Sequence, residues 1–237
     1  MGFSVFEVLA EFRVEDGIVM PVDGVYSVYV NGSYVSSLVM SPCYVSEAVI
    51  GFLVGSGVVG SLSDIIGVSI GDGNVDVSCK GPVRPVRLYV DDCVGFIESG
   101  GFVKSRVRVD RGLVEGVVSD FMSRLDRFHG VQATGLYDLS SNNAVIAFDV
   151  SRFMSIAKAL GYALTRGFSL DKSIAVASGR VSGDLVSMIA RLGIPILVGF
   201  KSILYSGFKY SILLGVTLIL YRGGELRILS YPERIST

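Results

Sequence analysis

The side chains best suited to nucleophilic or metal-binding chemistry are three cysteines, Cys43, Cys79 and Cys93, and one histidine, His129. The cysteines form no Cys-x-x-Cys pair, whereas a zinc site needs about four nitrogen or sulfur ligands in recognisable spacing. An odd, widely spaced set also argues against a disulfide framework. We therefore expect no bound metal, and any cysteine that takes part in chemistry would act as a single thiol.

Two short loops combine small residues with a cation, and each lies between an expected strand and an expected helix. The first covers residues 178–182 and the second residues 199–202. In open α/β sheets such loops lie at the carboxyl ends of strands, where ligands bind, and the N–H groups of a helix N-terminus favour an anion. Each loop alone could equally be an ordinary connection, but two loops on neighbouring parallel strands would face one crevice. The expected ligand-binding residues in these loops are Ser178, Gly179, Arg180, Ser182, Lys201 and Ser202.

The elements that must position these loops alternate between short apolar runs and amphipathic stretches. This alternation is typical of a doubly wound α/β layer with a largely parallel sheet covered on both faces. The expected helices span residues 112–127, 152–166, 183–192 and 203–214. The expected strands span residues 144–148, 173–177, 194–198, 216–221 and 225–230.

The first hundred residues show strand and turn patterns around one helix. Asn31-Gly32 predicts a tight hairpin between strands over 25–30 and 34–40, because both turn positions need a positive φ. A helix is expected over 44–54, followed by strands over 65–70, 75–78 and 85–90. We therefore expect an N-terminal α+β sub-domain over 1–108 and an α/β domain over 109–237.

Composition narrows the class of protein. Half of the 237 residues are hydrophobic and 18% are charged, which excludes intrinsic disorder. The most apolar stretch, residues 193–221, is interrupted by Lys201 and Lys209, so we expect no membrane span and a cytoplasmic protein. Residues 1–100 carry 12 acidic and 4 basic side chains, a net charge of −8, whereas the remainder is net positive. No stripe dense in Lys, Arg and aromatic residues predicts nucleic-acid binding.

Ordered motifs along most of the chain resemble the FdhD family of formate dehydrogenase accessory proteins. In the N-terminal half these are Val30-Asn31-Gly32, Pro42, Glu47-Ala48 and Gly51-Phe52-Leu53. The central part contributes Ala133-Thr134-Gly135 and Asp149-Val150, with Arg152, Lys158 and Gly161. The most specific succession is Ser178-Gly179-Arg180, Gly193-Ile194-Pro195, Arg222-Gly223-Gly224 and Pro232-Glu233-Arg234-Ile235.

The resemblance implies a fold, a reaction and partners. It implies a cytidine-deaminase-like α/β/α layer with an N-terminal α+β portion, in a homodimer. It also implies a sulfur carrier that takes sulfur from a cysteine desulfurase and passes it to the molybdenum cofactor of formate dehydrogenase or another molybdoenzyme. The guanine dinucleotide form of that cofactor, or a GDP-like nucleotide, would be bound, with Arg152 among the residues that contact it.

The chain departs from the family pattern where the chemistry is expected. Cys93 falls on the first cysteine of the family's Cys-Gly-x-Cys-Gly motif, but Phe96 replaces the second. Asp91 and Asp92 would raise the pKa of the Cys93 thiol, which opposes activation. Phe153 and the residue after it replace a His-Asn pair.

Three hypotheses follow from these departures. The first is an FdhD-like sulfur carrier that holds a persulfide on Cys93. The second is a catalytically degenerate, non-enzymatic chaperone or assembly protein that still binds the cofactor. The third, an unrelated small-molecule enzyme on the same scaffold, is the weakest, because no nucleophile–base pair or carboxylate dyad is evident.

Overall fold

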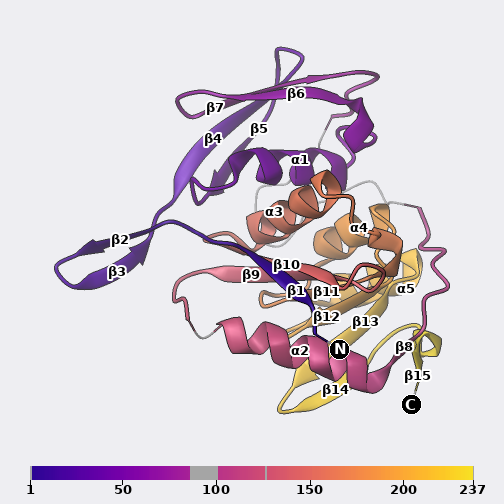
Figure 1. The fold of residues 1–237 in the computed structure, drawn as a ribbon. Helices are drawn as coiled ribbons and strands as arrows, with labels where there is room; N and C mark the ends of the chain where they lie inside the picture. Colours follow the sequence, from indigo (N-terminus) through magenta and orange to yellow (C-terminus); the bar gives the residue numbers. More distant parts are fainter. Residues whose placement is uncertain (1, 86–100, 126, 237) are drawn as a thin grey trace.

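A seven-stranded sheet forms the centre of the computed structural model, which describes residues 2–85, 101–125 and 127–236 (Figure 1). Most of its inner residues are fully buried, in agreement with a sheet covered on both faces. In spatial order the strands are β1 (Ser4–Val8), β10 (Asn143–Asp149), β9 (Gln132–Asp138), β11 (Ser173–Ala177), β12 (Ile196–Gly199), β13 (Thr217–Arg222) and β14 (Glu225–Ile228).

The sheet is mixed, and the expectation of a largely parallel sheet is wrong for two strands. β11, β12 and β13 are parallel neighbours, but β9 runs antiparallel to both β10 and β11. β14 is antiparallel to β13 across the Gly223-Gly224 turn, where both glycines have positive φ. Short connections of this kind can only join antiparallel strands, because a parallel pair needs a long crossover.

Helices cover both faces of this sheet (Figure 1). One apolar cluster joins the sheet to α3 (Arg152–Thr165) and α4 (Gly183–Arg191), with α5 (Tyr205–Leu214) beside α4. A second cluster on the opposite face joins it to α2 (Arg111–Leu125). The five expected helices therefore all exist, because an apolar stripe at helical spacing is a local signal.

A four-stranded sheet and α1 (Val45–Gly55) pack over α3 as a further layer (Figure 1). Asn31 and Gly32 both have positive φ, which confirms the predicted hairpin. The order of strands in this sheet is β5 (Ser33–Met40), β4 (Gly24–Val30), β7 (Asn74–Cys79) and β6 (Ile65–Ile70).

Smaller elements complete the chain. β2 (Phe12–Glu15) and β3 (Ile18–Pro21) form a two-stranded arm that projects from the body (Figure 1). β8 (Val109–Asp110) pairs in parallel with β15 (Ile235–Ser236) near the C-terminus. Single 3₁₀ turns cover Leu62–Asp64, Leu170–Lys172 and Pro232–Arg234.

The structure departs from the expected boundary at residue 108, because segments near both ends of the expected N-terminal sub-domain pack with the large sheet. β1 leaves the N-terminal layer and pairs in parallel with β10 at the edge of the large sheet. Val103 is 2% exposed and belongs to the core under α3 and α4. Strand pairing at a sheet edge and burial in a core both depend on residues far apart in the sequence. A domain boundary predicted from local composition cannot take such contacts into account.

α1 and α3 approach until their backbones touch, and glycine makes this possible. A Cβ placed on Gly51 would lie 1.8 Å from the carbonyl oxygen of Ala157, and one on Gly161 would lie 1.8 Å from that of Glu47. No side chain fits at either point, so the N-terminal layer is fixed to the large sheet by this close helix pair.

We predict that Gly161→Ala destabilises the protein by about 1–3 kcal/mol, because the added methyl forces α1 and α3 apart. Urea unfolding followed by circular dichroism measures this change. Gly116→Ala is the matched control, since Gly116 lies in α2 and a Cβ there meets nothing within 4 Å. Alanine should stabilise α2 by about 0.4–1 kcal/mol. Equal shifts for the two variants would contradict the helix-contact argument.

Candidate functional site

The two loops predicted to share a crevice run side by side. β11 and β12 are parallel neighbours that end at Ala177 and Gly199, which pair with each other. Beyond these strands, the Val181 N–H donates to the Ser202 carbonyl oxygen at 2.9 Å, and the Leu204 N–H donates to the Val181 carbonyl oxygen at 2.9 Å. The prediction that both loops lie at one sheet edge is therefore confirmed.

The serines of the first loop are engaged within the protein. The Ala133 N–H donates to the Ser178 hydroxyl oxygen at 2.8 Å, which ties this loop to β9. The Ser182 hydroxyl donates to the Asp184 carboxylate. Ser178 is 7% exposed and Ser182 is 2% exposed, so both hydroxyls shape the loop and do not project into a crevice.

The N-terminus of α4 is less open to an anion than expected. The Gly183 N–H donates to the Ser206 hydroxyl oxygen in the first turn of α5, at 3.2 Å. Asp184 places a carboxylate in the first turn of α4, where it interacts favourably with the helix dipole. The expectation of a free helix N-terminus is thus wrong for the Gly183 N–H.

Arg152, Gln132 and Gly179 come together from three elements at this same edge. A Cβ placed on Gly179 would lie 3.1 Å from Cβ of Arg152 and 3.3 Å from Oε1 of Gln132. Nη1 of Arg152 is buried and has no hydrogen-bond partner within the described part of the chain. A buried guanidinium N–H without an acceptor is costly. This atom is therefore the strongest indication of a site for an anionic or carbonyl oxygen.

Polar contacts hold Arg152 at the start of α3. The Met154 N–H donates to the Ser151 hydroxyl oxygen at 3.4 Å, which caps the helix. The Ser155 hydroxyl donates to the Arg152 carbonyl oxygen at 2.8 Å, and its oxygen lies 2.9 Å from the Thr134 hydroxyl oxygen on β9. The first turn of α3 is therefore fixed against β9.

A buried ion pair lies directly below this turn. Nζ of Lys158 is 2.6 Å from Oδ2 of Asp149, and both side chains are 0% exposed. Lys158 donates to the Ser41 carbonyl oxygen at 3.0 Å, and the Ser41 N–H donates to Asp149 at 3.1 Å. Burial raises the pKa of Asp149, while the Lys158 charge and the hydrogen bonds from Ser151 and Ser41 act against that increase. These contacts link β10, α3 and the end of β5.

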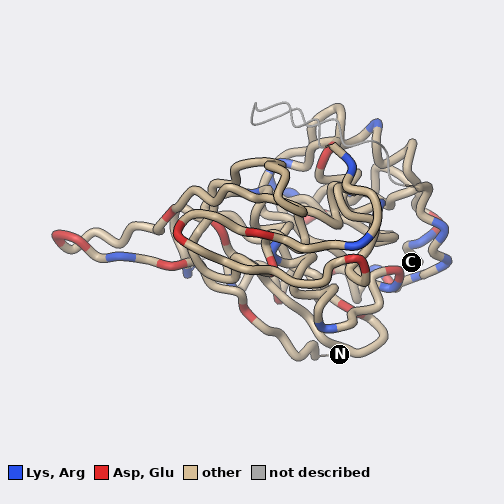
Figure 2. Tube along the Cα trace, turned by 90° about the horizontal axis from the view of Figure 1, so that it is seen from above, with Lys and Arg blue, Asp and Glu red and all other residues tan. Residues whose placement is uncertain are grey.

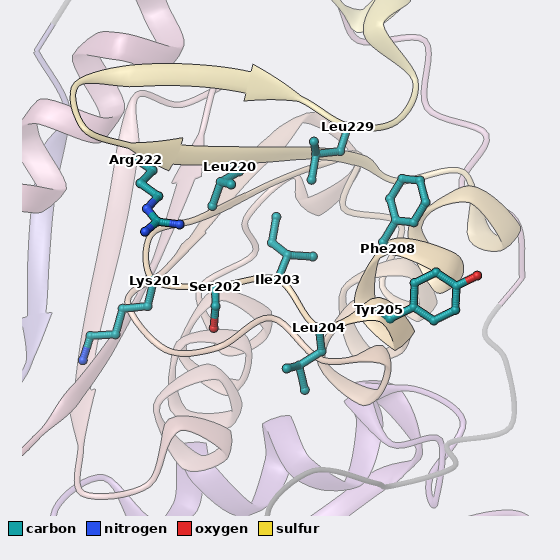
Figure 3. A pocket seen from close by; sticks show the side chains of 9 residues that line it. All are labelled: Lys201, Ser202, Ile203, Leu204, Tyr205, Phe208, Leu220, Arg222 and Leu229. Atoms are coloured by element: carbon teal, nitrogen blue, oxygen red, sulfur yellow. The ribbon is translucent and has the colours of Figure 1, made fainter.

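A pocket of about 440 Å³ lies beside the second loop (Figure 3). Lys201 and Arg222 lie at one end of it, and the aromatic rings of Tyr205 and Phe208 lie at the other. Such a lining suits a ligand that combines an anionic group with an apolar or aromatic body. The remaining lining residues are Ser202, Ile203, Leu204, Leu220 and Leu229.

Two of these site residues, Gln132 and Arg222, were not among the ligand-binding residues predicted from the sequence. Gln132 begins β9, whose Ala-Thr-Gly run has no apolar alternation and gave no strand signal. Arg222 ends β13, and the parallel order of β12 and β13 places it beside Lys201. A pairing scheme for the strands would have identified Arg222, since the carboxyl ends of parallel strands meet at one edge.

The three cysteines have different positions. Cys93 and the expected strand over 85–90 that precedes it lie outside the described residues, apart from residue 85. Cys79 is buried, and its N–H donates to Oδ1 of Asn31 at 2.9 Å, which fixes the hairpin turn. Cys43 is half-buried in the turn before α1. Exposed His129 lies just after α2.

No group of three or more His, Cys, Asp or Glu side chains in the described part of the chain could hold a metal ion. No helix in it is long and apolar enough to cross a membrane.

A model of the FdhD/NarQ family matches residues 22–236. The chain belongs to this family. The sulfur carrier protein FdhD of Methanothermobacter thermautotrophicus is 26% identical over 232 residues, which cover 94% of this chain and 93% of that protein. The sulfur carrier protein FdhD of Bacillus subtilis is 25% identical over 248 aligned positions, at 94% and 92% coverage.

The fold has a counterpart among solved structures. A crystal structure described as that of a formate dehydrogenase accessory protein from Desulfotalea psychrophila superposes with a TM-score of 0.76. The match covers 96% of this FdhD/NarQ chain and 98% of that one, at 20% sequence identity. The arrangement of sheets and helices is therefore shared.

We predict that Lys158→Met lowers the free energy of unfolding by about 3–5 kcal/mol, because it leaves the Asp149 carboxylate buried without its partner. Urea unfolding at neutral pH measures the loss. Lys80→Met is the matched control at an exposed lysine, and it should change stability by less than about 0.5 kcal/mol. A loss as small as that of the control would contradict a structural role for the pair.

Proposed function

We propose that this FdhD/NarQ protein is a cytoplasmic sulfur carrier in the maturation of formate dehydrogenase. The observation that carries the proposal is the nearly full-length match to proteins named sulfur carrier protein FdhD. Its partners would be a cysteine desulfurase as sulfur donor and formate dehydrogenase, or another molybdoenzyme, as the protein served. A homodimer stays a prediction from the family resemblance.

Cys93 is the proposed carrier. In the loading step its thiolate attacks the outer sulfur of a persulfide on the donor protein. A new sulfur–sulfur bond forms on Cys93, and the donor's cysteine leaves as a thiolate, so no external oxidant is consumed. One cysteine is sufficient for this exchange. Phe96, at the family's second cysteine position, removes the option of an internal disulfide between the two.

Incubation with a cysteine desulfurase and free cysteine should add one sulfur, about 32 Da, to the protein. Intact-protein mass spectrometry and peptide mapping should place the added sulfur on Cys93. Cys93→Ser should remove the adduct, and Cys43→Ser should retain it as the matched control. A wild-type chain without an adduct on Cys93, under conditions that load a two-cysteine FdhD protein, would rule out this sulfur-carrier mechanism.

The sulfur acceptor in this proposal is the molybdenum cofactor in its guanine dinucleotide form. The described residues fit a nucleotide-like anion: the buried Nη1 of Arg152 lacks a partner, and Gly179 leaves room beside it. Lys201 and Arg222 offer two further cations at the pocket by the second loop. Arg152 would hold a phosphate or carbonyl oxygen, and the pocket cations would neutralise phosphate charge.

We predict that GDP binds this protein and that Arg152→Gln weakens binding by at least about tenfold, the effect of one charge-assisted hydrogen bond. Calorimetric titration measures both dissociation constants. Arg166→Gln is the matched control, because Arg166 is exposed at the other end of α3 and its guanidinium lies over the Tyr162 ring. A flat titration, or equal affinity for the two variants, would contradict the nucleotide site.

A second candidate is a cofactor chaperone that carries no sulfur. The two hydrophobic residues that replace the family's polar His-Asn pair, Phe153 and Met154, favour this candidate. Phe153 packs against Phe52 with ring centroids 6.2 Å apart, and Met154 is 2% exposed in the core. These side chains contribute to packing and add no polar group to a crevice. GDP binding together with no persulfide on Cys93 would select this candidate.

A further inference from the structure

An extended segment over residues 103–109 alternates between buried and exposed side chains. Val103 and Val109 are buried, and Val107 packs against the core under α2. Lys104, Arg106 and Arg108 are exposed, and we call these three residues the basic stripe. Figure 1 shows the segment at the outer edge of the molecule, where it leads to β8 and α2.

The inner side of the segment is held firmly. Buried Arg234 donates from Nη2 to the Val103 carbonyl oxygen at 3.3 Å and from Nε to the Ser105 carbonyl oxygen at 3.4 Å. The Ser105 hydroxyl donates to the Asp171 carbonyl oxygen at 2.6 Å, and the Val103 N–H donates to the Leu214 carbonyl oxygen at 2.8 Å. These hydrogen bonds fix the backbone of the segment that carries the basic stripe.

Within the described part of the chain, the outer side of the segment is unpaired. No described residue forms an ion pair or a side-chain hydrogen bond with Lys104, Arg106 or Arg108. The backbone N–H and C=O groups of Lys104 and Arg106 also have no hydrogen-bond partner among the described residues. An extended segment with unpaired backbone groups is a template for the addition of another strand.

We propose that the basic stripe is a docking edge for an acidic, extended segment of a partner protein. The segment would add as a strand, with main-chain hydrogen bonds to Lys104 and Arg106. Alternate residues of a strand recur about every 6.6 Å on one face, so carboxylates at alternate positions would lie opposite the three cations. The proposal goes beyond sulfur transfer and does not depend on Cys93.

Charge and composition favour an acidic protein segment over nucleic acid. The residues between the three cations are Ser105 and Val107, so no aromatic ring is available for base stacking between them. The whole chain has a net charge of −1, and the acidic tip of the β2–β3 arm lies far from the basic stripe (Figure 2). The basic stripe therefore presents a local group of three positive charges, to which a short acidic segment would be complementary.

The test uses the full chain and a fluorescently labelled nine-residue peptide of alternating glutamate and threonine, with binding followed by anisotropy. We expect saturable binding to the wild type. The double variant Arg106→Glu, Arg108→Glu should weaken it by at least about tenfold. The double variant Lys80→Glu, Arg84→Glu makes the same charge change at exposed residues of the N-terminal layer and should leave binding unchanged. Circular dichroism checks that both variants fold.

Two N-methylated peptides test the strand geometry with wild-type protein alone. Each carries methyl groups on one alternate set of backbone amides, and only one set faces the docking edge. One peptide should lose binding, and the other should bind like the parent peptide. The proposal is overturned if the parent peptide does not bind, if the stripe variant binds it normally, or if both methylated peptides bind equally. It is also overturned if oligothymidylate of matched charge binds the stripe more tightly than the peptide.

Discussion

The buried contact between Lys158 and Asp149 is the interaction on which the arrangement of the site depends. Two fully buried charges 2.6 Å apart are stable only when their remaining hydrogen-bonding groups are also satisfied. Ser41 meets this need from the end of β5, through its carbonyl oxygen and its N–H. One cluster thereby connects the four-stranded sheet, the end of β10 and α3.

The close packing of α1 against α3 also fixes the position of α3, through steric contact between the two backbones. Gly51 and Gly161 bring the two helices into backbone contact, so α3 has little freedom to slide. The Asp149 carboxylate accepts the Ser151 N–H at 2.8 Å and so fixes the residue before Arg152. The orientation of the Arg152 guanidinium therefore depends on contacts that reach into the N-terminal layer.

The polar residues at the carboxyl edge divide into two groups. Ser178 and Ser182 are used inside the protein, where they connect the first loop to β9 and to α4. Arg152, Lys201 and Arg222 have no ion-pair partner among the described residues. The cations therefore define what this edge can bind, and the serines define its shape.

The sequence by itself determined the elements whose signals are local. Apolar stripes at helical spacing predicted the five α-helices that the described residues form, and Asn31-Gly32 predicted the β4–β5 hairpin, because side-chain periodicity and turn chemistry act within a few residues. The pairing of the two loops also followed from strand–helix alternation. Only the tertiary structure decided the antiparallel place of β9, the move of β1 to the large sheet, and the meeting of Arg152 with Gln132 and Gly179. These features rest on contacts between residues far apart in the chain, and such contacts leave no period or motif in the sequence around each partner.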